Sequence, residues 1–222
     1  MATRPVLLSL NKAHFPVTTL GPGRRIGLWL QGCSIRCPGC VSQDTWAPDL
    51  ARAVEVEVVL TWCQRLLVAG VDGVTISGGE PFDQPAALHA LLAGLRARIG
   101  LDSKGPEVDL LCYSGYGERV LRRRHGTILG LLDAAIVGPY RRGAGEGSAW
   151  WGSANQRLVP LSELGRRRYA EGAPSGARRA MQVAVDDEGV WMIGVPRPGD
   201  MERLESLMQR RGVGLSQVSW RP

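Results

Sequence analysis

The hydrophobic positions of the chain predict buried strands that alternate with amphipathic helices. Short apolar runs rich in β-forming residues lie at 26–30, 71–76, 108–113 and 134–137. Apolar residues with helical spacing fill the intervals, at 59–66, 88–99 and 118–124, with a further short helix at 128–132. Strands that alternate with helices favour a parallel sheet with right-handed crossovers. The pattern therefore predicts an α/β fold.

The pattern changes after residue 158. Residues 166–179 are rich in Arg, Gly, Ala and Pro, which is typical of a mobile connection. Two alternating runs around Asp-Asp-Glu-Gly follow in residues 181–195 and predict a β-hairpin, and a helix is expected over about 200–211. We therefore divide the chain into a core with an N-terminal strand at 1–164, a flexible basic connection at 165–180, and a hairpin–helix appendage at 181–222.

Each of the four predicted strands is followed by a loop that contains glycine. In chain order these loops read QGCSIRCPGC, SGGEPF, SGYGE and GPYRR. Parallel α/β folds gather their binding sites at the carboxyl ends of their strands. The four loops are therefore expected to meet at one mouth.

Charge and composition restrict the class of protein. The net charge is +6, and the basic runs at 122–124, 166–168 and 178–179 consist of arginine without interleaved aromatic residues. A solvated face therefore explains them better than a nucleic-acid surface. The N-terminus does not resemble a signal peptide, and no apolar run is long enough to span a membrane. Together with an odd count of five cysteines, this predicts a cytoplasmic protein with reduced thiols and no membrane partner.

Three of the five cysteines lie within eight residues. Cys33, Cys37 and Cys40 have the spacing C-x3-C-x2-C. Clustered thiolates bind zinc, copper(I) or iron–sulfur clusters. Cys63 and Cys112 lie in a predicted helix and a predicted strand, so they are expected in the core, and nothing around His14 or His125 marks either as a fourth ligand. Three thiolates on a cluster of four irons leave one iron open to another ligand. Iron–sulfur is favoured over zinc or unligated thiols once the SGGEP motif that follows is counted.

The cysteine motif at one strand end and SGGEP at the next resemble the radical S-adenosylmethionine superfamily. The resemblance implies that Cys33, Cys37 and Cys40 hold a [4Fe-4S] cluster, and that S-adenosylmethionine is reductively cleaved there to a deoxyadenosyl radical that abstracts hydrogen. It also implies that Glu80 offers its carboxylate to the ammonium of the cofactor. Ser114 is expected to bond the carboxylate or ribose, with a plain turn serine as the alternative. The cofactor loop comprises Ser77, Gly78, Gly79, Glu80 and Pro81. No catalytic residue is expected beyond the cluster and the cofactor.

Further motifs between residues 21 and 158 resemble the anaerobic ribonucleotide reductase activating enzymes, a branch of glycyl radical enzyme activases. These are CYSGY, IVGPY and GSANQRL, together with Gly39 before the last cysteine. The branch implies a partial (β/α) barrel, and it places Gly39, Asn155 and Gln156 near the cofactor or substrate. It also implies a protein substrate and a reduced flavodoxin- or ferredoxin-type electron donor.

The chain departs from the branch at positions where a target would be recognised. Leu20, Val41, Ser42 and Val137 replace an acidic residue, a His-Asn pair and an aspartate. The identity of the target is therefore open. Two alternatives remain: a radical enzyme of the same chemistry that modifies a peptide or small molecule, and a non-catalytic metal-binding module.

Overall fold

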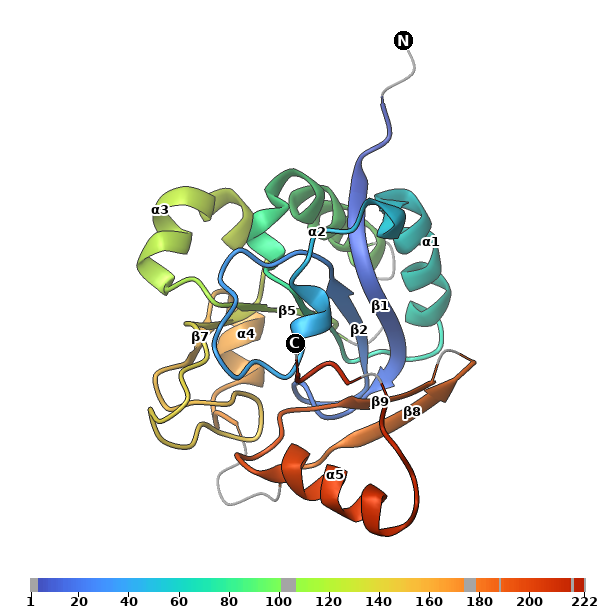
Figure 1. The fold of residues 1–222 in the computed structure, drawn as a ribbon. Coiled ribbons are helices and arrows are strands. Elements are labelled where there is room, and N and C mark those ends of the chain that lie inside the picture. Colours follow the sequence, from blue (N-terminus) through green and yellow to red (C-terminus); the bar gives the residue numbers. More distant parts are fainter. Residues whose placement is uncertain (1–3, 101–106, 174–178, 188, 217, 222) are drawn as a thin grey trace.

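A mixed sheet of seven strands forms the centre of the protein, in the order β3-β1-β2-β4-β5-β6-β7 (Figure 1). The computed structural model describes residues 4–100, 107–173, 179–187, 189–216 and 218–221. The strands are β1 (Leu7–Val17), β2 (Arg25–Leu30), β3 (Ala53–Glu55), β4 (Gly73–Gly78), β5 (Asp109–Ser114), β6 (Ala134–Val137) and β7 (Arg157–Pro160).

The four strands predicted from the apolar runs form the parallel centre of this sheet. β2, β4, β5 and β6 pair in parallel, so that their carboxyl ends lie at one edge. Three antiparallel strands extend the centre, β1 and β3 on one side and β7 on the other. The N-terminal strand was predicted, whereas β7 was not, because its four residues carry little periodicity. The partial (β/α) barrel implied by the resemblance stays a prediction.

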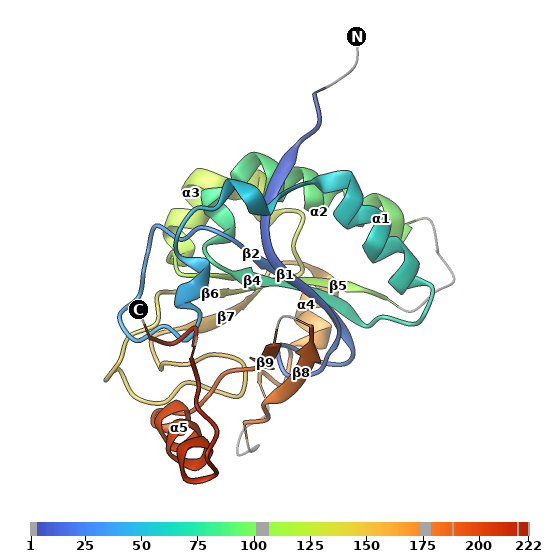
Figure 2. The ribbon, with the colours of Figure 1, turned by 45° about the vertical axis from the view of Figure 1, so that its right-hand side comes forward.

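Three helices cover one face of the sheet (Figure 2). They are α1 (Val56–Leu67), α2 (Pro85–Gly100) and α3 (Glu118–Leu129). Leu88, Leu91, Leu92 and Leu95 of α2 are fully buried against the strands, as their helical spacing predicts. Val54, Val56 and Val58 alternate with other residues as in a strand, but they do not form one strand. Only Val54 lies in β3, which ends at Glu55, and Val56 and Val58 lie in α1, which begins at Val56. None of the described helices combines the length and apolar character that crossing a membrane requires.

The C-terminal part lies over the opposite face (Figure 2). It consists of α4 (Glu163–Arg168), the predicted hairpin β8 (Gln182–Asp186) and β9 (Gly189–Ile193), and the predicted helix α5 (Asp200–Arg210). The hairpin forms its own two-stranded sheet, and its Ala184 and Ile193 pack on Val17 and Leu20. The hairpin is thus held to the core by apolar contacts and by hydrogen bonds such as that from Thr19 Oγ1 to Ile193 O at 3.0 Å, rather than by pairing with a strand of the large sheet.

The basic segment expected to be mobile begins as ordered structure. Arg166–Arg168 form the last turn of α4, and Tyr169 after them is only 3% exposed. Ser162 caps this helix by accepting a hydrogen bond from the N–H of Gly165. Residues 165–169 of the predicted connection thus include helical structure and a buried tyrosine, which arginine and glycine composition does not reveal, and the division into domains stays a prediction. Residues 174–178 of that connection lie outside the described residues.

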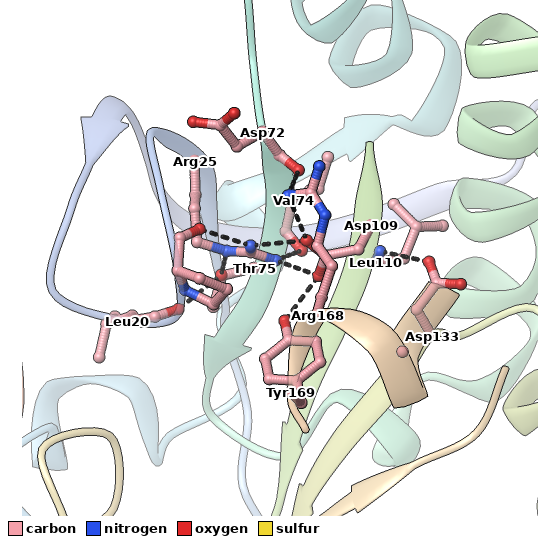
Figure 3. Close-up of polar contacts among 12 residues, drawn as sticks. Leu20, Arg25, Asp72, Val74, Thr75, Asp109, Leu110, Asp133, Arg168 and Tyr169 are labelled. Atoms are coloured by element: carbon pink, nitrogen blue, oxygen red, sulfur yellow. Dashed lines mark hydrogen bonds and ion pairs between the residues drawn. The ribbon is translucent and has the colours of Figure 1, made fainter. Parts of the chain in front are cut away.

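A fully buried ion pair joins the amino ends of the parallel strands (Figure 3). Arg25 at the start of β2 donates two hydrogen bonds to the carboxylate of Asp109 at the start of β5, at 2.9 and 2.8 Å. Its remaining guanidinium hydrogens reach Thr75 Oγ1 and two backbone carbonyl oxygens. Tyr169 donates its hydroxyl hydrogen to the same carboxylate at 2.6 Å. The segment that follows α4 is thereby hydrogen-bonded to the amino ends of the strands.

We expect Asp109→Asn to destabilise the protein strongly, because it leaves the Arg25 guanidinium buried without its counter-charge. Removal of one partner from a buried pair costs about 3–5 kcal/mol. Urea denaturation monitored by circular dichroism would measure the loss. Glu163→Gln is the matched control, since it removes an ion pair with Arg166 at the surface and should change stability little. Equal stability of the two variants would contradict this account.

Candidate functional site

The three clustered cysteines lie on one loop that leaves the carboxyl end of β2. The loop closes on its own later residues: the N–H of Gly32 donates to Thr45 O at 2.8 Å, and the N–H of Cys33 donates to Trp46 O at 3.0 Å. The N–H of Cys40 donates to Cys37 O at 3.0 Å, which forms a turn between the last two cysteines. The segment with the spacing C-x3-C-x2-C thus forms a closed loop at the edge of the sheet where the four glycine-containing loops were expected to meet.

The three thiols are free, half-buried neighbours. Burial raises the pKa of each of Cys33, Cys37 and Cys40. The charge of Cys33 also raises the pKa of Cys37, and both of them raise that of Cys40, so the three sulfurs lie within electrostatic reach of one another. Soft thiol ligands grouped in this way suit an iron–sulfur cluster. Among the described residues, no three His, Cys, Asp or Glu side chains are grouped closely enough to share one metal ion.

The glycine loop after β4 is paired with the cysteine loop through the backbone. The N–H of Gly79 donates to Leu30 O at 2.8 Å, and the N–H of Glu80 donates to Gly32 O at 2.9 Å. Gly78 has a φ of +98°, and a Cβ there would collide with the backbone of Leu30. A Cβ on Gly79 would collide with the carbonyl oxygen of Gly32. Both glycines are therefore required for the approach of the two loops.

The Glu80 carboxylate joins the ends of β4 and β5. Its Oε1 accepts hydrogen bonds from Ser114 Oγ at 2.8 Å and from the N–H of Phe82 at 3.1 Å, and its Oε2 accepts one from the N–H of Gly115 at 2.8 Å. Glu80 is 1% exposed, and burial raises its pKa from 4.5 to about 7. Ser114 is 5% exposed and its hydroxyl hydrogen is directed to Glu80. These two predicted cofactor residues therefore contact each other.

Asp83 connects the first three loops, a role that the sequence did not reveal. Its carboxylate accepts hydrogen bonds from the N–H and hydroxyl of Ser34, at 2.7 and 2.9 Å, and from the hydroxyl of Tyr116 at 2.9 Å. Because Ser34 lies 49 residues away, no local pattern could have shown this contact.

The fourth loop is organised by Gln156. Its Oε1 accepts from the N–H groups of Gly152 and Ser153, at 3.1 and 3.2 Å, and its Nε2 donates to Gly138 O at 3.1 Å. Asn155 is exposed and donates from Nδ2 to Pro139 O at 2.8 Å. Both side chains thus fold the segment between β6 and β7, and the N–H of Gly138 donates to Ser114 O at 3.0 Å. This loop lies beside the β5 loop.

Gly39 and Ser77 complete the predicted set. Gly39 has a φ of +81°, which favours glycine, and the guanidinium of Arg142 from the fourth loop lies beside it. Ser77 pairs with Trp29 in the parallel ladder, and Pro81 begins the short 3-10 helix η3 (Pro81–Asp83). The structure therefore brings the predicted residues of all four loops to one edge of the sheet.

The other two cysteines are in the core, as predicted. Cys63 on α1 and Cys112 in β5 are fully buried, and burial raises the pKa of Cys63 to about 12. His14 and His125, which the sequence did not mark as metal ligands, have aromatic neighbours: His14 contacts Trp191 and His125 contacts Phe82.

Comparison with known proteins identifies the region that carries the cysteines. The family described as "4Fe-4S single cluster domain" matches residues 19–159. The chain belongs to this family. The matched region includes all four loops described above and ends within β7, so α4, the hairpin and α5 lie beyond it.

Several curated relatives are named anaerobic ribonucleoside-triphosphate reductase-activating proteins. The protein of Vibrio cholerae is 30% identical over 147 residues, which are 64% of this chain and 92% of the relative. The protein of Enterobacteria phage T4 is 28% identical over 140 residues, 62% of this chain and 85% of the relative. The protein of Escherichia coli K12 is 26% identical over 149 residues, 64% of this chain and 93% of the relative. These homologues support the activase branch predicted from the motifs.

We expect Gly79→Ala to separate the two paired loops, because its Cβ would meet the carbonyl oxygen of Gly32. The variant should unfold at a lower temperature and expose the cysteines to alkylating reagents. Differential scanning calorimetry and mass spectrometry would measure the two effects. Gly117→Ala is the matched control, since nothing lies within 4 Å of a Cβ at that position. Similar behaviour of the two variants would argue against the loop pairing.

We expect Glu80 to make the metal-free protein less stable as the pH rises from about 4.5 to about 7. Its folded pKa of about 7 exceeds the ordinary value of 4.5, so in this window the folded state binds more protons than the unfolded state. The contribution of Glu80 to the free energy of unfolding is fully present below pH 4.5 and is lost as the pH rises through 7. Urea titrations across this range should show a steeper decline for the wild type than for Glu80→Gln. Parallel curves would contradict the raised pKa.

Proposed function

We propose that the protein is a radical S-adenosylmethionine enzyme of the activase type. The observation that carries the proposal is the backbone pairing of a three-cysteine loop with the Gly78–Glu80 loop at the carboxyl edge of a parallel sheet. The membership in a 4Fe-4S family and the names of the relatives support it. The partial (β/α) barrel belongs to the same proposal, and the parallel β2-β4-β5-β6 order with helices on one face is compatible with it.

Cys33, Cys37 and Cys40 would hold the [4Fe-4S] cluster. The residues fit this group because they are three free thiols on one loop within electrostatic reach of one another, and because Cys63 and Cys112 are buried elsewhere. When bound, cluster and S-adenosylmethionine supply a one-electron cleavage to methionine and a deoxyadenosyl radical, which takes a hydrogen atom and leaves deoxyadenosine and a substrate radical. The raised thiol pKa values imply that the loop must release protons when it binds metal.

The glycine loop would bind the methionine part of the cofactor. Gly78 and Gly79 carry no side chain and are half-buried, and Ser77 and Pro81 flank them. Glu80 Oε1 already accepts two hydrogen bonds from the chain, whereas Oε2 accepts one from Gly115. Oε2 therefore retains the acceptor capacity that an ammonium group of the ligand requires. Glu80 would act in addition by fixing the glycine loop against Ser114 and Gly115.

The proposed target is a protein, with a glycyl radical as the product. The relatives are named for the activation of an anaerobic ribonucleoside-triphosphate reductase, and we extend that activity to this chain as a proposal. A reduced flavodoxin- or ferredoxin-type protein would supply the electron. Arg36 of the cysteine loop, Arg119 at the start of α3 and Arg142 of the fourth loop are exposed, and their positive charge suits an acidic donor. A reducing cytoplasm would keep the thiols available.

The experiment is anaerobic reconstitution with iron and sulfide, followed by reduction with dithionite in the presence of S-adenosylmethionine. We expect brown protein with about four irons per chain and release of deoxyadenosine. A glycyl radical signal in electron paramagnetic resonance after addition of an anaerobic reductase would establish the target. Deoxyadenosine without that signal would favour the alternative of a peptide or small-molecule substrate. Colourless protein that binds zinc would identify a non-catalytic module.

Changing Cys33, Cys37 or Cys40 to Ala should abolish deoxyadenosine formation and lower the iron content, because each removal takes away a cluster ligand. Cys63→Ala is the control with the same chemical change in the core, and it should keep its iron. Iron analysis and chromatography of the nucleoside products measure both effects. Full activity in any of the three loop variants would refute the ligand assignment.

A further inference from the structure

The end of the chain lies against the cysteine loop. The N–H of Gln43, three residues after Cys40, donates to Ser219 O at 2.7 Å, and its side-chain Nε2 donates to Trp220 O at 3.0 Å. In return, Ser219 Oγ donates to Val41 O at 2.7 Å. These three hydrogen bonds join segments that are more than 170 residues apart.

Gln43 also connects this contact to the last cysteine. Its Nε2 donates a second hydrogen bond, at 3.1 Å, to the carbonyl oxygen of Cys40. The N–H of Ser42 lies 3.4 Å from the Cys40 sulfur and donates to it. The backbone on both sides of Ser42 is therefore held from the C-terminal end, through Val41 and Gln43.

Helix α5 provides the anchor for this end. The indole N–H of Trp220 donates to Glu205 Oε1, and Arg221 forms an ion pair with the same carboxylate oxygen at 3.0 Å. Glu205 and Trp220 are partly buried, so this contact is less screened by water than one at an open surface. The chain of contacts therefore runs from α5 through Trp220 and Gln43 to Cys40.

We propose that residues 218–221 form a clamp that positions Cys40, and with it the third ligand of the cluster loop. The clamp lies outside residues 19–159, which the family match covers, so it is a feature that the appendage adds to the family region. The role toward the cluster rests on the proposed function; the mechanical role in holding the loop does not. Gln43 and Ser219 are positioning residues, because they reach Cys40 only through the backbone.

The clamp should act on the local opening of the loop rather than on global unfolding. Loss of one or two hydrogen bonds changes an opening equilibrium by a factor of about 2 to 10 for each bond. The three hydrogen bonds described above cross only between residues 41–43 and 219–220. Segments remote from this contact, including the buried Cys63 and Cys112, should be unaffected.

The test measures the alkylation of each cysteine by iodoacetamide in the metal-free full-length protein, resolved by mass spectrometry. Gln43→Ala removes the side-chain hydrogen bonds to the carbonyl oxygens of Trp220 and Cys40 while its N–H keeps the bond to Ser219 O, and Glu205→Ala removes the anchor without touching the loop. We expect Cys40 to react about 5 to 10 times faster in either variant. The double variant should react no faster than the faster single variant, because both changes break one chain of contacts.

Glu202→Ala is the matched control, since it lies exposed on the same helix and takes no part in the clamp. Its Cys40 should react at the wild-type rate. Unchanged Cys40 reactivity in both Gln43→Ala and Glu205→Ala would overturn the proposal. An equal acceleration at Cys63 would also overturn it, because the whole chain would then have loosened.

A second measurement addresses the cluster. In reconstituted protein, Glu205→Ala should shift the midpoint potential of the cluster and speed its loss in air, since solvent exposure is one of the factors that set such potentials. An unaltered potential together with an unaltered rate of loss would show that the clamp does not position a cluster ligand. Failure to reconstitute any cluster would refute the proposed function, while the alkylation result would still decide the clamp.

Discussion

The site depends on the direct backbone contact between the loop after β2 and the loop after β4. In the parallel register, Leu30 at the end of β2 lies opposite Gly78 at the end of β4. The hydrogen bonds from Gly79 and Glu80 to Leu30 and Gly32 continue that pairing beyond the strands and into the cysteine loop. Two consecutive glycines are required because any Cβ would occupy the space of the opposing backbone. The place of the thiols relative to the glycine loop is thereby determined by the sheet itself.

The polar side chains at the two ends of the parallel strands make different kinds of contact. At the amino ends, Arg25 and Asp109 form a fully buried and fully hydrogen-bonded pair, to which Tyr169 contributes. At the carboxyl ends, the polar side chains are Glu80, Ser114 and Asp83, and they connect loops rather than strands. The first end therefore holds a buried ion pair, and the second carries the thiols and the glycine loop. This division is usual for parallel α/β folds, whose sites form at the carboxyl ends of strands.

The C-terminal part extends the family region in two ways. Its hairpin covers the sheet face opposite the helices through Ala184 and Ile193, and its last residues reach the cysteine loop. α4 and Tyr169 connect it to the amino ends of the strands. The C-terminal part, which includes α4 and Tyr169, therefore contacts both ends of the parallel strands.

Local spacing by itself determined the four parallel strands, the three large helices, the hairpin and the three adjacent thiols. Apolar periodicity and the cysteine and glycine motifs depend only on neighbours along the chain, so they can be read without a structure. Tertiary structure alone decided that Asp83 bonds Ser34, that Glu80 bonds Ser114, and that Gln43 bonds the carbonyl oxygen of Trp220. Each of these depends on pairing residues tens to nearly two hundred positions apart. Such contacts follow from the packing of the whole chain, because a single side chain can satisfy its hydrogen bonds with many partners and only the fold selects one.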